Sequence, residues 1–150
     1  MKYCLFRFFD VFEAIAIYLI CFASNLLCIY AQTLNLESSP ILKSFLESIT
    51  NYQLIINILL SFIIIIFHYQ FLNRRKTEIF CRILVGDTMA NIIIRYILNS
   101  ITILVFSFLL SLSLNFYLGL NVTSNLYLIF IFIIYILFSA GYLYYLVGNR

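Results

Sequence analysis

Residues 52–72 read YQLIINILLSFIIIIFHYQFL, and residues 73–87 read NRRKTEIFCRILVGD. The first stretch is an almost uninterrupted apolar run, and the second is the only dense cluster of charge in the chain. A helix crosses a bilayer with about 20 consecutive apolar residues, so the first stretch is long enough to do so. The two stretches together predict a membrane-spanning helix followed by a charged segment on one side of the membrane.

The composition extends this prediction to the whole chain. Of its 150 residues, 65% are hydrophobic and only 10% are charged, whereas about 25% of a soluble domain is charged. Four apolar runs are long enough to span, at about residues 11–31, 52–72, 94–118 and 126–147. We therefore expect an all-α membrane protein in which residues 1–150 form a single domain of four transmembrane helices.

The positions of Lys and Arg predict the orientation, because basic residues concentrate in cytoplasmic loops. They gather before the first span, between the second and third spans, and at the end of the chain, at Lys2, Arg7, Arg74, Arg75, Lys76, Arg82, Arg95 and Arg150. The loop 32–51 holds Lys43 against Glu37 and Glu47. Both termini and the middle loop are therefore expected in the cytoplasm, and loop 32–51 outside.

The outer loop 32–51 has a pattern of its own. Ser38-Ser39-Pro40 offers an N-cap followed by proline near the first helical position. One face of the following segment is apolar, through Ile41, Leu42, Phe45, Leu46 and Ile49. This predicts a short amphipathic helix on the outer membrane surface. It can be a simple connector that covers the span ends, or a gate or receptor for an amphipathic peptide.

The segment 73–91 carries the strongest functional signal. Arg75, Glu78 and Arg82 are spaced i, i+3, i+7, so they share one face of a helix. The other side is apolar and can enter the headgroup region, through Ile79, Phe80 and Ile83. We expect a cytoplasmic amphipathic elbow helix between the second and third spans, which serves as a docking platform. The alternative is a basic anchor that only fixes the topology.

The end of this elbow and the start of the next helix are also marked in the sequence. Gly86 is a natural C-terminal stop. Asp87 or Thr88 can then cap a helix that runs through 92–94 into the third span.

The spacing in this segment resembles the cytoplasmic elbow of FtsX/MacB-like permeases of ABC transporters. In that family Arg-x-x-Glu-Ile is followed by a basic residue, an apolar pair, a Gly, and an Ile six residues later. The matching residues here are Arg75, Glu78, Ile79, Arg82, Leu84, Val85, Gly86 and Ile92. The predicted order of one span, an outer segment and three further spans is similar to that of the family.

The chain also departs from the family pattern. Phe80 stands where a small residue is usual, and Leu84 where an Ala is usual. The acid often found early in the third span is absent, and Asn99 or Ser100 occupies that region. The outer segment has only about 20 residues, so functions that need a large outer domain are placed in doubt.

The resemblance implies a permease subunit that couples ATP hydrolysis by a separate ATPase to export or removal of a hydrophobic or peptide substrate. It implies that an ATPase dimer docks on the elbow, and it assigns the coupling to Arg75, Glu78, Ile79, Arg82 and Gly86. Four spans form half a transporter, so a second permease copy is expected, in a homodimer or a heterodimer. The permease itself is expected to have no catalytic or nucleotide site, since no Gly-x-x-x-x-Gly-Lys-Ser/Thr occurs.

The remaining polar residues favour packing over chemistry. Asn25, Asn57 and Asn99 can hydrogen-bond between helices, and Ser107 and Ser111 allow close helix approach. The four cysteines are expected to be small apolar filler. We therefore expect no metal, cofactor or nucleic-acid partner.

Two other functions stay open. The chain can be a small membrane immunity or interaction protein that acts without an ATPase, as bacteriocin immunity proteins do. A membrane enzyme or secondary carrier is less favoured, because the spans contain no deep charge and no catalytic pair. The bias towards Ile, Phe, Tyr and Asn indicates an A/T-rich genome, so we expect the plasma membrane of a low-GC Gram-positive bacterium.

Overall fold

The computed structural model describes residues 7–33, 40–119 and 125–148, and these residues form five helices with no strand among them. The helices are α1 (Phe8–Thr33), α2 (Pro40–Asn51), α3 (Gln53–Leu84), α4 (Met89–Leu118) and α5 (Leu126–Gly148). Helices are expected here because a helix satisfies its own backbone hydrogen bonds, which lipid cannot do.

Four of these helices are long and apolar enough to cross a membrane, at Phe8–Ala31, Gln53–Leu84, Met89–Leu118 and Leu126–Val147. Each overlaps one of the four runs predicted from the sequence. The chain thus has the helices of an all-α, multi-pass membrane protein, as predicted.

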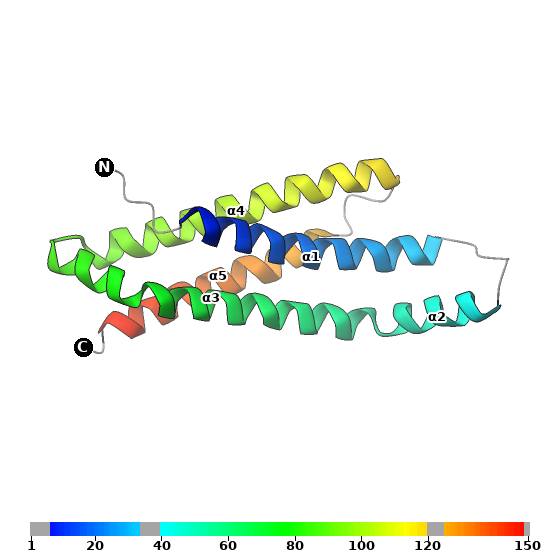
Figure 1. Ribbon diagram of the computed structural model, residues 1–150, viewed down its shortest axis with the longest axis horizontal. Helices are drawn as coiled ribbons and strands as arrows, with labels where there is room; N and C mark the ends of the chain where they lie inside the picture. Colours follow the sequence, from blue (N-terminus) through cyan, green and yellow to red (C-terminus); the bar gives the residue numbers. More distant parts are fainter. Residues whose placement is uncertain (1–6, 34–39, 120–124, 149–150) are drawn as a thin grey trace.

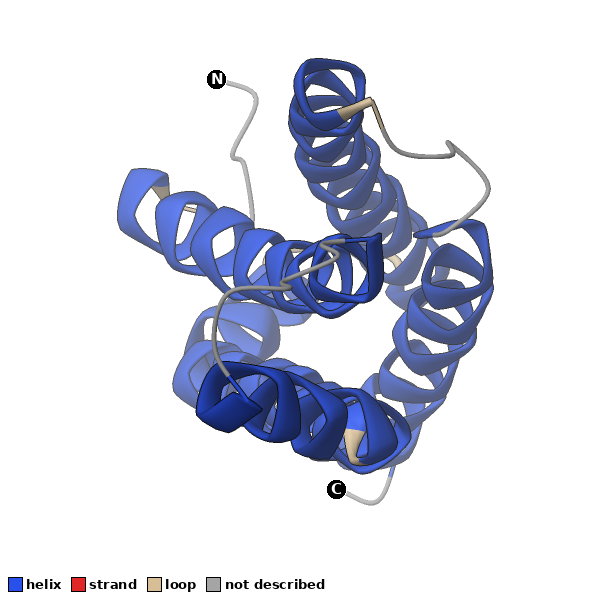
Figure 2. Ribbon diagram, turned by 90° about the vertical axis from the view of Figure 1, so that its right-hand side faces the viewer, coloured by secondary structure: helices blue, strands red, loops and turns tan. Residues whose placement is uncertain are grey.

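The four long helices pack as a bundle (Figures 1 and 2). Helix α1 contacts α3 and α4, and α5 contacts the same two helices. The start of α1, the turn between α3 and α4, and the end of α5 lie at one end of the bundle, on the left in Figure 1. We refer to this end as the turn end, and to the opposite end as the α2 end. The bundle core is aromatic where α1 meets α5, since the ring centroids of Tyr18 and Phe22 lie 5.5 and 5.6 Å from that of Phe132.

Helix α2 confirms the amphipathic helix predicted in the outer loop. It begins at Pro40, and its apolar Ile41 and Phe45 are 82% and 60% exposed. The predicted capping serines, 38 and 39, lie outside the described residues. Figure 1 shows α2 running on in roughly the direction of α3, since backbone hydrogen bonds continue across Tyr52. The position of this helix on the outer membrane surface stays a prediction.

The predicted separate elbow helix is not a separate element. Residues 73–84 are the last turns of α3, which continues without a break to Leu84. The physical reason is that no Gly or Pro interrupts residues 72–84, and that Glu78 pairs with arginines one turn before and after it. We call residues 73–84 the α3 extension, and residues 84–88 the tip.

Candidate functional site

The tip is a defined turn that stops α3 at the predicted glycine. Gly86 has a φ of +102°, a conformation that favours glycine. Its N–H donates to the Ile83 carbonyl at 3.0 Å, and the Asp87 N–H donates to the Arg82 carbonyl at 3.0 Å. This is the Schellman arrangement that closes a helix C-terminus. The next helix is then capped by the Thr88 side chain, which accepts from the Asn91 N–H at 3.4 Å.

Below the tip, the α3 extension carries a row of ion pairs. Arg82 donates to Glu78 at 2.8 Å, and Arg75 donates to the other oxygen of Glu78 at 3.0 Å. Arg75 also forms an ion pair with Asp10 of α1, and both residues are 8% exposed. The row therefore starts near the tip and ends in a buried contact between α3 and α1.

Asp10 is held in place from its own side as well. It lies in the first turn of α1, where a carboxylate is favourable to the helix dipole. Its Oδ2 accepts from the backbone N–H of Arg7 at 3.1 Å, which resembles one half of a capping box. The start of α1 thus presents a fixed carboxylate to Arg75.

A second, exposed pair lies beside the buried one. Arg74 donates to Glu13 at 3.0 Å, and the two side chains are 51% and 44% exposed. Arg74 also lies four residues before Glu78, but it pairs with the neighbouring acid on α1. Two consecutive arginines of α3 therefore bind two acids that lie one turn apart on α1.

The five predicted coupling residues do not share one exposed surface. Arg75 and Ile79 are buried against the bundle, whereas Glu78 and Arg82 are partly exposed and Gly86 is exposed. The sequence had placed Ile79 towards the headgroup region, but it is 0% exposed.

Sequence reasoning missed two features of this site. The first is the exposed apolar pair at the tip, Leu84 and Val85, which are 71% and 90% exposed. The second is the partnership of α1 with the extension. The sequence does contain a sign of this contact, because Asp10 and Glu13 stand at the start of an apolar span, where acids need partners.

A polar chain crosses the centre of the bundle. His68 Nε2 and the Tyr18 hydroxyl share a hydrogen bond of 2.8 Å, and His68 Nδ1 and the Tyr96 hydroxyl share one of 2.7 Å. Tyr96 reaches Ser139 of α5 at 2.7 Å. The His68 side chain lies on the buried face of α3, and the residue is 2% exposed.

A second polar cluster lies at the α2 end. Asn25 Oδ1 accepts from Gln53 at 3.1 Å, from Asn57 at 3.0 Å and from the Tyr127 hydroxyl at 2.9 Å. The Asn25 amide donates to Asn125 at 2.7 Å. Asn25 is fully buried and joins α1, α3 and the start of α5, so Asn25 and Asn57 hydrogen-bond between helices as predicted.

The described residues offer no group of three or more His, Cys, Asp or Glu side chains that could hold a metal ion. Cys21 and Cys28 are buried free thiols. When the chain is compared with models of known protein families, with curated proteins and with solved structures, no match is found.

Proposed function

We propose that this chain is the membrane subunit of an ABC transporter, and that a separate ATPase binds its tip on the cytoplasmic side. The observation that carries the proposal is the pair Leu84 and Val85, two highly exposed apolar side chains at a turn that closes on Gly86. Apolar anchors with charged groups around them are typical of protein contact sites. Here the charged groups are Glu78 and Arg82, one to two helical turns away on α3.

The ion pairs connect the α3 extension, which carries the tip, to helix α1. Arg75 binds Asp10 in a buried contact, and Arg74 binds Glu13 beside it. A displacement of the α3 extension by a bound partner therefore acts on α1 as well as on α3. In this proposal Arg75 and Ile79 stiffen the extension, and the contact itself is made by the exposed residues of the tip together with the partly exposed Glu78 and Arg82.

In the proposed mechanism the partner hydrolyses ATP, and this chain transmits the resulting motion through the membrane. The sequence contains no phosphate-binding loop of the P-loop type, so ATP hydrolysis belongs to the partner. Two copies of the chain, or one copy with a related partner, supply the two tips that an ATPase dimer needs. Closure of the ATPase dimer moves the tips, and the bundle transmits the motion to the α2 end.

The test is co-purification of an ATPase from the native membrane. Val85→Asp places a charge on a side chain that is 90% exposed, so the fold is retained while the apolar contact is lost. Tyr117→Asp is the matched control, because Tyr117 is 89% exposed near the α2 end. We expect the wild type and Tyr117→Asp to retain the ATPase, and Val85→Asp to lose at least nine-tenths of it.

A charge reversal gives an independent check. Glu78→Lys removes the acid between Arg75 and Arg82, whereas Glu47→Lys makes the same change on α2, at the other end of the bundle. Only the first is expected to reduce ATPase binding. Full transport or full protection against a peptide by purified protein without any ATPase would overturn the proposal, and would favour an immunity protein that acts alone.

A further inference from the structure

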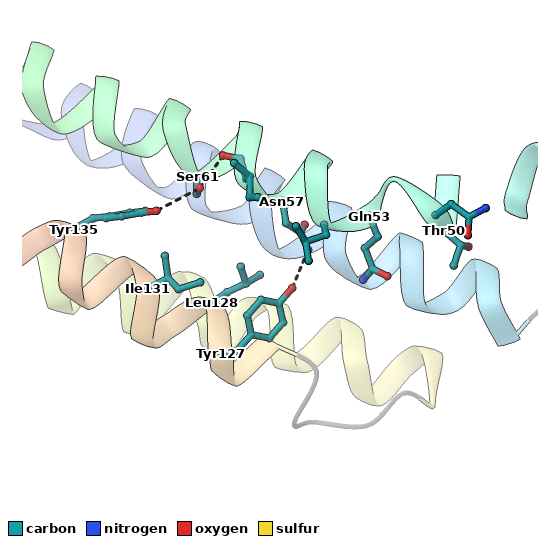
Figure 3. A pocket seen from close by; sticks show the side chains of 11 residues that line it. Thr50, Gln53, Asn57, Ser61, Tyr127, Leu128, Ile131 and Tyr135 are labelled. Carbon is teal, nitrogen blue, oxygen red and sulfur yellow. Dashed lines mark hydrogen bonds between the residues drawn. The ribbon is translucent and has the colours of Figure 1, made fainter. Parts of the chain in front are cut away.

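A cavity of about 500 Å³ lies between α3 and α5 in the half of the bundle nearer the α2 end (Figure 3). Its volume is within the range of about 300–1,000 Å³ that is usual for ligand sites. On the α3 side, Gln53, Asn57 and Ser61 follow one another at intervals of four residues, so they share one face of the helix. On the α5 side, Tyr127 and Tyr135 are eight residues apart and face them.

The polar groups of the two walls are already ordered. Asn57 donates to the Tyr127 hydroxyl at 2.8 Å, and Tyr135 donates to Ser61 at 3.4 Å. On the side of α3 that faces α1, Gln53 and Asn57 both donate hydrogen bonds to Asn25. The site is therefore preformed, which lowers the entropic cost of binding a ligand.

The lining has a specific chemistry. Among the described residues that line the cavity, none is charged, and amide and hydroxyl groups stand beside Leu and Ile side chains. Arg and Lys form the strongest hydrogen bonds to a lipid phosphate, and this lining offers neither. A peptide backbone offers neutral donors and acceptors, which amides and hydroxyls can both match.

The cavity also opens towards the surroundings of the bundle. Leu54 and Ile58 line it on α3, and they are 70% and 47% exposed. A ligand dissolved in the membrane can thus enter from the side. A second cavity of about 380 Å³ shares Tyr135 and continues along the same two helices, with an almost wholly apolar lining that includes Ile65 and Phe138.

We propose that the groove between α3 and α5 binds an uncharged, apolar peptide segment from the lipid phase. The hydroxyl and amide groups bind the peptide backbone, and the Leu and Ile side chains bind its apolar side chains. This inference rests on the proposed function in one respect, since only that function would make the bound peptide a transport substrate. The binding site itself does not depend on an ATPase.

The test uses the absence of tryptophan from the chain. Leu54→Trp adds the only tryptophan of the chain at the mouth of the cavity, at a side chain that is 70% exposed. The protein is placed in phosphatidylcholine vesicles without any ATPase, so no other protein contributes tryptophan. It is titrated with an acetylated and amidated Leu/Ala peptide that carries a dansyl group. We expect saturable energy transfer from the tryptophan to the peptide.

Two further variants separate binding from fold. In the Leu54→Trp background, Asn57→Leu is expected to weaken peptide binding at least tenfold. Because Asn57 also contacts Asn25, Tyr135→Phe is the milder variant, and it is expected to weaken binding about threefold with an unchanged unfolding midpoint. The reporter Leu109→Trp, which is 57% exposed on α4, is expected to show only the non-saturable transfer of a peptide dissolved in lipid.

Two outcomes would overturn the proposal. One is the same transfer at Leu54→Trp and Leu109→Trp, with no response to either binding variant. The other is quenching of Leu54→Trp by brominated phosphatidylcholine that the peptide does not relieve, which would make the groove a lipid site. Because no ATPase is present, either outcome leaves the docking proposal untouched, and a loss of ATPase docking leaves the groove untouched.

Discussion

Replacement of Asp10 by Asn is expected to destabilise the bundle by about 3 kcal/mol. Asp10 and its partner Arg75 are both 8% exposed, so the change leaves a buried guanidinium short of one anion. Removal of one partner from a buried ion pair costs about 3–5 kcal/mol. The lower end applies here, because Arg75 keeps its second partner, Glu78, at 3.0 Å.

The neighbouring pair supplies a control on the same two helices. Glu13→Gln removes the same charge from α1, one turn further along, and also leaves one arginine without its partner. The Arg74 and Glu13 side chains are 51% and 44% exposed, and pairs of this kind contribute about 0–1 kcal/mol. The two substitutions differ chiefly in burial.

The measurement is reversible unfolding in mixed micelles, followed by circular dichroism, for the wild type and both single variants. A double-mutant cycle of Asp10→Asn with Arg75→Met then isolates the pairwise term. We expect a coupling free energy of about 2 kcal/mol or more, since part of the cost of each single change is the charge left behind. If Asp10→Asn costs no more than Glu13→Gln, or if the coupling is zero, the buried contact does not tie the α3 extension to α1.

Four further changes are measured in the same assay. Gly86→Ala is expected to cost about 1 kcal/mol, because the φ of +102° strains any L side chain. The same change at helical Gly141, where an added Cβ meets nothing within 4 Å, should stabilise by about 0.5–1 kcal/mol. His68→Leu is expected to cost about 1–2 kcal/mol, since it leaves two buried hydroxyls without their shared hydrogen bonds. Asn25→Leu removes four hydrogen bonds and is expected to cost about 2 kcal/mol, at about 0.6 kcal/mol each. Equal unfolding free energies for both glycine variants, or no change for His68→Leu or Asn25→Leu, would contradict the respective argument.

Much of the fold was predictable because it depends on local properties of the chain. The spans follow from the length of the apolar runs, and α2 follows from Pro40 and an apolar face. The stop of α3 follows from Gly86, because glycine adopts a positive φ at little cost. The pairing of Glu78 with Arg75 and Arg82 was also predictable, since these residues are three and four positions apart.

The continuation of α3 beyond the span was not predictable in the same way. The sequence shows where polar residues replace apolar ones, but it does not require the helix to break there. Only an observed backbone could show that residues 73–84 continue α3 without interruption.

By itself, therefore, the sequence determined the helices, their approximate bounds and the cluster of charge that follows the second span. Only the tertiary structure decided which side chains meet across the bundle. Asp10 meets Arg75 at a separation of 65 residues, and Asn25 meets Tyr127 at 102. The physical reason is that a membrane helix is apolar towards lipid and towards its neighbours alike, so hydrophobic periodicity does not mark the buried face. Which face of each helix points into the bundle is set by packing and by the partners that buried polar groups require. Both exist only once the helices have assembled.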